Sequence, residues 1–228
     1  MRRVVSLFLP TWPCDRVRRK NAGVPPHDCP MVTVMQEGNR RVIAAADEAA
    51  RRIKLHPGMT LAHAQSLVPD LHVVEAAPQE DGAALEQLGL WCTRYSPLVT
   101  PDPPDGVFID IAGSAHLFKG ETALLQDISS RLAASGINGK VAVADTPGCA
   151  WAVARFGGES IVAPGRIADA LGGLPVSALR ISQKTVGCLH DMGIERIAHL
   201  ATKPPAILIL AVRFIVGGLR CPKCQGLR

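Results

Sequence analysis

The chain has 228 residues, of which 47% are hydrophobic and 20% charged, so it can bury a real core and is not disordered throughout. The formal net charge of +5, with an isoelectric point near 9.0, mildly favours a polyanionic partner such as nucleic acid. No apolar run approaches the ~20 residues of a membrane span, and seven scattered cysteines suit a reducing compartment. We therefore expect a cytoplasmic protein with no membrane partner.

The first part of the chain predicts a buried strand followed by a small inserted subdomain. Residues 4–9 form a run that is apolar apart from Ser6, and residues 15–20 form a basic helical stretch. Gly38-Asn39 is typical of a hairpin turn, and Thr60 stands where a helix begins. The elements predicted here are strands at 31–35, 41–46 and 73–74 and helices at 47–53 and 60–67.

The middle of the chain alternates helices with strands. Amphipathic helices are predicted at 81–95 and 121–134, strands at 98–101, 107–111 and 141–144, and a further helix at 147–156. Joined to the first strand, these elements follow the split βαβ, or ferredoxin-like, plan of an α/β (α+β) protein, with residues 12–72 as the insertion. The inward face of the second amphipathic helix is expected to carry Leu124, Leu125, Ile128 and Leu132.

Beyond Pro164 the pattern becomes helical. Residues 179–214 predict a helix, a tight turn, a second helix and a third helix after Pro204-Pro205. The turn around Gly193 resembles the hairpin of a helix–hairpin–helix module, in which backbone N–H groups approach DNA phosphates. A helical hairpin that only packs is an equally weighted alternative. The single CxxC, at Cys221 and Cys224, lacks a second half-site, so no zinc site and no other metal site are expected.

Several segments, taken in order, match one known family. They are 42–51 with Pro57-Gly58-Met59 and 62–69, then 94–97 with Asp105 and 108–110, then 144–150, and finally Leu174-Pro175 with the Gly193 hairpin. Through them the chain resembles the Y-family (UmuC-like) translesion DNA polymerases over residues 1–214, and among these the catalytically degenerate ImuB-type accessory proteins. The resemblance implies a ferredoxin-like palm (1–11 and 73–165), inserted fingers (12–72) and a helix–hairpin–helix-like thumb (166–214).

The resemblance also indicates which catalytic groups are missing. Family polymerases end the first strand in Asp-x-Asp, and the aligned positions here are Leu7 and Leu9. Of the later Asp-Glu pair, Asp105 is kept as a vestige and the glutamate is replaced by Gly106. Two-metal phosphoryl transfer needs several carboxylates, which an aliphatic side chain cannot replace. We therefore expect no catalytic residues, and Mg²⁺ as a cofactor only if the protein is an active polymerase after all.

The contacts that hold the nucleotide in the family are eroded as well. Glu48 aligns with a tyrosine that would bind phosphate, and Trp151 aligns with a helix lysine. Arg51 matches the phosphate-binding arginine and is kept as a vestige. Trp12 falls where a bulky side chain screens the ribose.

The leading hypothesis is therefore a non-catalytic accessory protein of DNA repair and damage-induced (SOS) mutagenesis that binds DNA weakly and without sequence preference. The resemblance implies as partners an error-prone C-family polymerase, the sliding clamp, RecA and a small companion protein. One alternative is an active low-fidelity translesion polymerase that uses Asp105, Asp110 and Asp102. Another is a ferredoxin-like interaction module with no DNA role. The residues expected to contact DNA are Arg180, Lys184, Gly193, Arg196 and Lys203.

The end of the chain departs from the family pattern. After Phe214 the sequence no longer resembles the family, and no little-finger domain follows. We expect a C-terminally truncated product, with 215–228 as a tail outside the family pattern that lacks the partner-binding segment.

Overall fold

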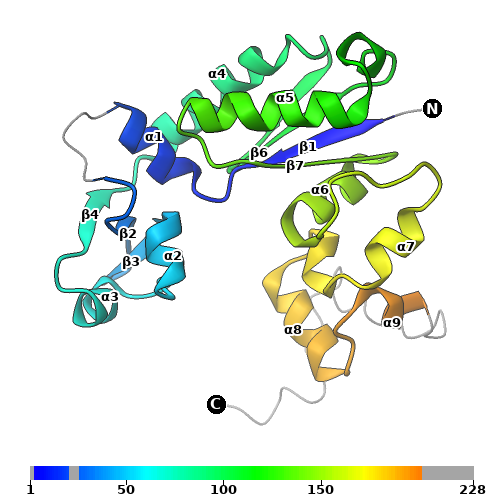
Figure 1. Ribbon diagram of the computed structural model, residues 1–228. Helices are drawn as coiled ribbons and strands as arrows, with labels where there is room; N and C mark the ends of the chain where they lie inside the picture. Colours follow the sequence, from blue (N-terminus) through cyan, green and yellow to red (C-terminus); the bar gives the residue numbers. More distant parts are fainter. Residues whose placement is uncertain (1–2, 21–25, 202–228) are drawn as a thin grey trace. The chain divides into compact units, whose positions relative to one another are not determined.

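A computed structural model describes residues 3–20 and 26–201 (Figure 1). The chain forms two compact units, Leu7–Val141 and Met1–Ser6 together with Ala142–Arg228. This division does not coincide with the predicted palm, fingers and thumb boundaries, which remain expectations. Within the described ranges, no helix is both long enough and apolar enough to cross a membrane.

The larger sheet has the strand order expected of a ferredoxin-like plan. Its order is β5-β6-β1-β7, so the first strand in the sequence lies between the third and fourth of this sheet. Figure 1 shows α4 and α5 on the same side of the sheet. The bounds are β1 (Val4–Phe8), α4 (Pro78–Cys92), β5 (Val99–Asp102), β6 (Gly106–Asp110), η1 (Ala115–Phe118), α5 (Glu121–Ala134) and β7 (Lys140–Ala144).

The two covering helices bury the faces that their apolar residues form. The four predicted inward residues of α5 are all buried, and α4 buries Leu85, Leu88 and Cys92. Gly89 lets α4 approach β5 closely, because a Cβ built at that position would lie 3.0 Å from a Pro101 side-chain carbon. Helix α4 begins and ends three residues earlier than predicted, and Tyr95 lies just beyond it, buried.

A second sheet, of order β3-β2-β4, supports the inserted segment. Strands β2 (Met31–Glu37) and β3 (Arg40–Ala46) form the predicted antiparallel hairpin, with Gly38 at φ +57° in the turn. Strand β4 (His72–Glu75) pairs parallel with β2, so residues 73–75, which we assigned to the palm, belong to this sheet.

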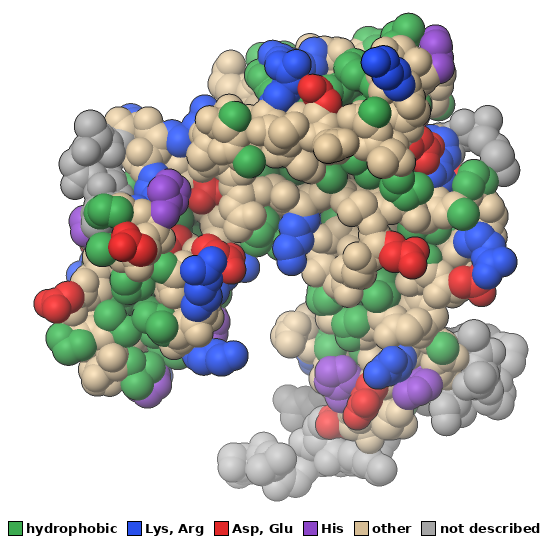
Figure 2. All heavy atoms as spheres, in the orientation of Figure 1, with side chains coloured by type: hydrophobic (Ala, Val, Ile, Leu, Met, Phe, Trp, Pro, Cys, Tyr) green, Lys and Arg blue, Asp and Glu red, His purple; other side chains and the backbone are tan. Residues whose placement is uncertain are grey.

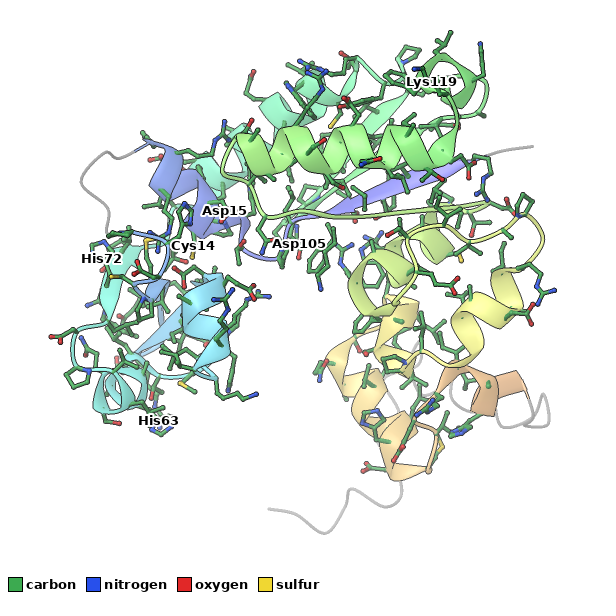
Figure 3. All side chains as sticks on the ribbon, in the orientation of Figure 1. Cys14, Asp15, His63, His72, Asp105 and Lys119 are labelled. Atoms are coloured by element: carbon green, nitrogen blue, oxygen red, sulfur yellow. The ribbon has the colours of Figure 1, made fainter. Side chains whose placement is uncertain are left out.

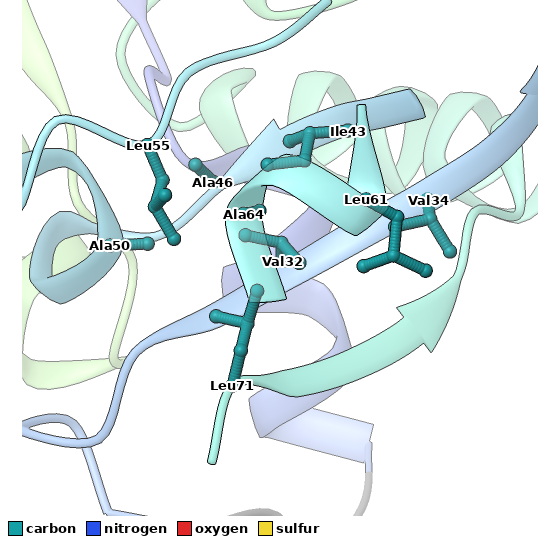
Figure 4. Close-up of a cluster of buried hydrophobic side chains, with 9 residues drawn as sticks. All are labelled: Val32, Val34, Ile43, Ala46, Ala50, Leu55, Leu61, Ala64 and Leu71. Atoms are coloured by element: carbon teal, nitrogen blue, oxygen red, sulfur yellow. The ribbon is translucent and has the colours of Figure 1, made fainter. Parts of the chain in front are cut away.

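Short helices close the core of this second sheet. They are α2 (Glu48–Arg52) and α3 (Leu61–Leu67), and α1 (Trp12–Lys20) contacts β2, β3 and α4. Figure 4 shows the buried side chains that meet between the sheet and these helices: Val32, Val34, Ile43, Ala46, Ala50, Leu55, Leu61, Ala64 and Leu71.

The C-terminal part of the described chain is helical, as the sequence predicts. Its elements are α6 (Pro147–Phe156), α7 (Ile167–Gly172), η2 (Val176–Leu179), α8 (Gln183–Asp191) and α9 (Ile197–Ala201). Val176, Val186, Leu189 and Ile194 form a small core that joins η2, α8 and the turn after α8. The helix predicted after Pro205 and the tail at 215–228 lie outside the described residues.

Candidate functional site: a polymerase-like sheet face

Asp105 lies where the sequence motif places it, beside the end of β1. Its backbone oxygen accepts a hydrogen bond of 2.8 Å from the Leu9 N–H, which joins the turn before β6 to the residue after β1 (Figure 3). The residue is partly buried. The motif that carries Asp105 therefore meets the first strand, as the resemblance implies.

The side chains of Leu7 and Leu9 point into the core and not toward the open face of the sheet. Both are fully buried, and a Cβ built at Gly139 would lie 3.1 Å from Leu7 Cδ1 and 3.0 Å from Leu132 Cδ1. Leu132 belongs to the buried face of α5, so Leu7 faces that helix. Because side chains alternate along a strand, Phe8 faces the opposite side.

The β1 residue on the open face of the sheet is therefore not the residue that the motif aligns with an acid, but its neighbour. Val107 and Ile109 of β6 are buried, whereas Phe108 and Asp110 are partly exposed, so the alternate face of β6 is the open one. Phe8 is the β1 residue on that side near Asp105, so the position that faces the site is Phe8 and not Leu7. The chemical conclusion is unchanged, because residues 4–9 contain no carboxylate.

The remaining acids do not form a site that fits Mg²⁺. Gly106, directly after Asp105, is buried and has no side chain. An Asp110 oxygen accepts a 3.0 Å hydrogen bond from the Ala112 N–H, which ties this carboxylate to the local turn. Across the described residues, no group of three or more His, Cys, Asp or Glu side chains is arranged to hold a metal ion. We derive no metal-dependent step for this face.

Arg51 and Trp12, whose roles the resemblance supplied, both have structural contacts. The Arg51 guanidinium donates to the backbone oxygens of Ala46 (3.1 Å) and Pro10 (2.5 Å), which holds α2 against the segment after β1. Trp12 is 1% exposed, and its Nε1–H donates to the Asp81 carbonyl at 2.9 Å. Trp12 is therefore a core residue, and its ring packs inside the protein at the position where the family places a bulky side chain beside the ribose.

A polar pocket of about 470 Å³ lies between α1, α2 and the segment after α5. One wall is the buried ion pair of Arg18 and Asp47 (2.6 Å), and Asp47 also caps α2 through the Ala50 N–H. Asp15, another lining residue, accepts hydrogen bonds from the Thr11 hydroxyl and the Asn138 N–H, both at 2.9 Å. Burial raises the pKa of Asp15 to about 6.

Sequence reasoning missed this pocket, because its groups come from segments more than 100 residues apart. A signal was present in the helix pattern. Asp15 occupies the buried side of α1 with Cys14 and Val17, and an acid at an apolar-face position indicates a tertiary partner. The pairing of Arg18 with Asp47 carries no comparable local signal, because the hairpin lies between them.

Trp151, at the position of the family lysine, is partly exposed on α6 and is surrounded by cations. The Cζ atoms of Arg155 and Arg180 lie 4.3 and 5.0 Å from its ring centroid. A lysine could form a charged contact with a phosphate at this position, whereas the indole offers an aromatic surface bordered by guanidinium groups.

The predicted DNA-contacting turn is stabilised by its own helix. The N–H groups of Met192, Gly193 and Ile194 all donate to carbonyls of α8, and Gly193 has φ +73°. These bonds form a C-terminal cap of α8, so these N–H groups are not oriented toward an external phosphate. Lys184 and Arg196 are exposed, and Lys203 lies outside the described residues.

Charge on the molecular surface is mixed where it can be seen. Figure 2 shows Lys and Arg side chains interspersed with acidic ones over the face that it draws. This face has no continuous basic strip of the kind that gives tight binding to nucleic acid.

The strand order and the position of Asp105 beside the end of β1 are those of a polymerase-palm type of fold. Comparisons with known proteins agree with this class. Residues 18–155 match the model of the IMS, impB/mucB/samB family. The chain therefore belongs to this family, the UmuC-like domain of Y-family polymerases.

Among its relatives is the protein ImuB of Caulobacter vibrioides, which is 45% identical over 155 residues, covering 68% of this chain and 34% of that protein. DNA polymerase IV of Dehalococcoides mccartyi is 27% identical over 186 residues, covering 79% of this chain and 48% of that enzyme. The chain thus spans about a third to a half of the length of these relatives.

Solved structures share the fold. DinB from Sulfolobus solfataricus superposes with a TM-score of 0.72 at 16% identity, over 96% of this chain and 68% of that one. An insertion ternary complex of the Dbh DNA polymerase gives 0.73 at the same identity, over 96% and 69%. At this identity the likeness shows the shared Y-family fold.

Proposed function

We propose that this chain is a non-catalytic member of its family that binds DNA in damage-induced mutagenesis and assists translesion synthesis by another polymerase. The observation that carries the proposal is the end of β1 beside Asp105, where Leu7 and Gly106 stand at the positions of the family's other acids and residues 4–9 contain no carboxylate. A single carboxylate cannot hold two divalent ions and neutralise the charge that develops on the transferred phosphoryl group.

The nucleotide contacts support the same proposal. Arg51 donates to two backbone oxygens, and Glu48 stands at the start of α2, where a negative charge opposes phosphate binding. The kept fold supports a scaffold role, since fold and chemistry separate readily. Contacts with a C-family polymerase, a sliding clamp, RecA and a small companion protein belong to the same proposal and rest on the resemblance to ImuB-type accessory proteins.

Primer extension tests the proposal directly. The purified chain is given an undamaged or an abasic template, all four nucleotides, and Mg²⁺ or Mn²⁺, and D. mccartyi DNA polymerase IV is run in parallel as an active control. We expect no extension by the chain under conditions in which the control extends. Far-UV circular dichroism and a cooperative thermal transition confirm that the protein is folded.

The Asp105→Ala variant separates the proposal from the polymerase alternative. Extension by the parent chain that this substitution abolishes would show a rebuilt metal site and overturn the proposal. Extension that survives both the substitution and further purification would also overturn the proposal, whereas extension that is lost on further purification identifies a contaminating polymerase.

DNA binding separates the proposal from an interaction module with no DNA role. We expect weak binding to oligonucleotides that falls as salt rises, because phosphate contacts release counterions. Binding that is absent even at low salt would favour the interaction module.

A further inference from the structure

Trp151 stands at the centre of a small aromatic and cationic cluster on α6. Arg155, one turn further along the helix, and Arg180, after η2, place guanidinium carbons 4.3 and 5.0 Å from the indole centroid. The ring of Phe156 lies 6.2 Å from the same indole and is tilted by 50°. Elements α6 and η2 are in contact, so the cluster is formed within one compact unit (Figure 1).

Arg180 has a backbone conformation that is unfavourable for residues other than glycine. Arg180 has φ +58° and ψ +32°, the left-handed region that side chains other than glycine avoid. A residue held in this region is a reason to look for a function of its side chain. Here that side chain lies over an indole and adds a second positive charge beside it.

The indole is partly exposed in a helix whose neighbouring residues are mostly buried. The neighbouring α6 residues 149, 150, 152, 153 and 154 are buried, whereas Trp151 is partly exposed and Phe156 is 41% exposed. Helical side chains lean toward the preceding turn, which here contains Gly148. A Cβ built at Gly148 would meet nothing within 4 Å, so the space directly beside this glycine is open.

The chemistry of the cluster fits one kind of ligand. Guanidinium groups pair with phosphate oxygens in a planar, bidentate geometry, and two of them around one ring favour an anion. Aromatic rings and guanidinium planes also stack on nucleobases that are not already stacked in a duplex. An unpaired nucleotide supplies both the anion and the base.

We propose that Trp151 binds single-stranded DNA by stacking on an unpaired base, while the exposed Arg180 contacts the adjoining phosphate and Arg155, whose Nη1 is buried, supports the indole ring. The inference rests on the proposed function, since it presupposes that the chain binds DNA. It gives that binding a preference for unpaired template, which phosphate contacts alone do not provide.

Fluorescence anisotropy on the full chain tests the inference with three labelled probes of equal length. They are an oligothymidylate, the corresponding abasic strand and a duplex. We expect the chain to prefer the oligothymidylate over the abasic strand, and Trp151→Ala to weaken binding of the oligothymidylate on the order of tenfold. Binding of the abasic strand and the duplex should change less than about twofold, because neither presents a free base.

Trp91→Ala is the matched control. Trp91 forms the same kind of pair on α4, with Arg94 Cζ at 4.3 Å from its ring centroid. We expect no change in DNA affinity from this substitution. Trp151→Phe keeps an aromatic ring and should retain most of the affinity, whereas Trp151→Leu keeps apolar bulk and should lose it. This second pair preserves the test if the alanine variant unfolds.

Three results would overturn the inference while leaving the proposed function intact. These are equal affinity for the oligothymidylate and the abasic strand, an unchanged Trp151→Leu variant, and an equal loss in the Trp91 control. Displacement of the oligothymidylate by polyglutamate as effectively as by unlabelled DNA would identify a general polyanion site and also overturn it. If the parent chain binds none of the probes at low salt, the proposed function itself fails.

Discussion

Asp15 is an acid held inside the protein, with 6% of its surface exposed. Two hydrogen bonds to one of its oxygens favour the charged form, yet desolvation has the larger effect, and the pKa rises from 3.8 to about 6. The folded protein therefore binds a proton between about pH 4 and pH 6, where the unfolded chain has already released it. Its contribution to stability is greatest below pH 4 and is lost as pH rises toward 6.

Asp15→Asn removes this titration while keeping an oxygen that accepts hydrogen bonds. We expect the unfolding free energy of the parent protein, relative to the variant, to fall by about 2 kcal/mol between pH 4 and pH 7. Urea unfolding at several pH values measures the difference, and the subtraction cancels the other carboxyl groups. A difference that does not change with pH would contradict the raised pKa.

Arg51→Ala should destabilise the fold, because it leaves the Pro10 and Ala46 carbonyls without their donor. We expect a loss of about 1–3 kcal/mol of unfolding free energy. Arg52→Ala is the control, since that side chain is 76% exposed and its ion pair with Glu48 is 3.9 Å long. Equal stabilities of the two variants, measured by urea unfolding at pH 7, would show that Arg51 is not a structural residue.

At the level of residues, the sequence predicted the buried face of a helix better than it predicted which way the side chains of a strand point. The four inward leucine and isoleucine positions of α5 were predicted from helical spacing and are confirmed. The alignment of Leu7 with a family acid did not predict its orientation, because a motif fixes the order of residues and not which side of a strand they face. The contacts of Trp12 and of the Arg18–Asp47 pair depend on distant segments and had no local pattern.

Among the elements, β1 provides the clearest test of which side chains face the core and which face the open side of the sheet. Leu7→Asp places a charge in the core against α5 and should cost more than about 4 kcal/mol of unfolding free energy. Phe8→Asp places the same group on the opposite, partly exposed face and should cost less than half as much. Thermal and urea unfolding of the two variants distinguish the faces. If Phe8→Asp is the more damaging substitution, Leu7 is the residue on the open face.

The helix caps differ in a way that the sequence did not reveal. Thr146 accepts a 3.3 Å hydrogen bond from the Cys149 N–H at the start of α6, whereas Thr60, which we predicted as a cap, makes no side-chain cap bond. Thr146→Ala should therefore cost about 1 kcal/mol, and Thr60→Ala only a few tenths. Urea unfolding of the pair measures both, and a larger loss at Thr60 would show that its hydroxyl caps α3 in solution.

Helices with strong periodicity were predicted with correct bounds, as α5 and α6 show. Helix α4 was shifted because Pro78 can occupy a first helical turn, which the predicted start at residue 81 did not use. Strand β4 was recognised, but its sheet was not, because four residues carry no information about their pairing partner.

For the whole molecule, the positive net charge predicts salt-dependent DNA binding without sequence preference. Lys184→Glu combined with Arg196→Glu should reduce the slope of log affinity against log salt by about 1.4 on single strands, if each residue contacts one phosphate. The control double variant, Lys119→Glu with Arg94→Glu, changes the net charge by the same amount. Both residues are exposed, and they lie shortly after η1 and α4. Equal slopes for the two double variants would assign the binding to net charge and not to the α8–α9 region.

The strand order of the larger sheet has a consequence for synthesis. Strand β1 is made first, but its two neighbours, β6 and β7, begin about 100 and about 135 residues later. At ribosomal rates of roughly 5–20 residues per second, its two edges stay unpaired for on the order of ten seconds. An apolar, uncharged strand exposed for that time is a site for chaperone capture or for aggregation between nascent chains. The yield of native protein should therefore depend on the rate of translation as well as on the stability of the finished fold.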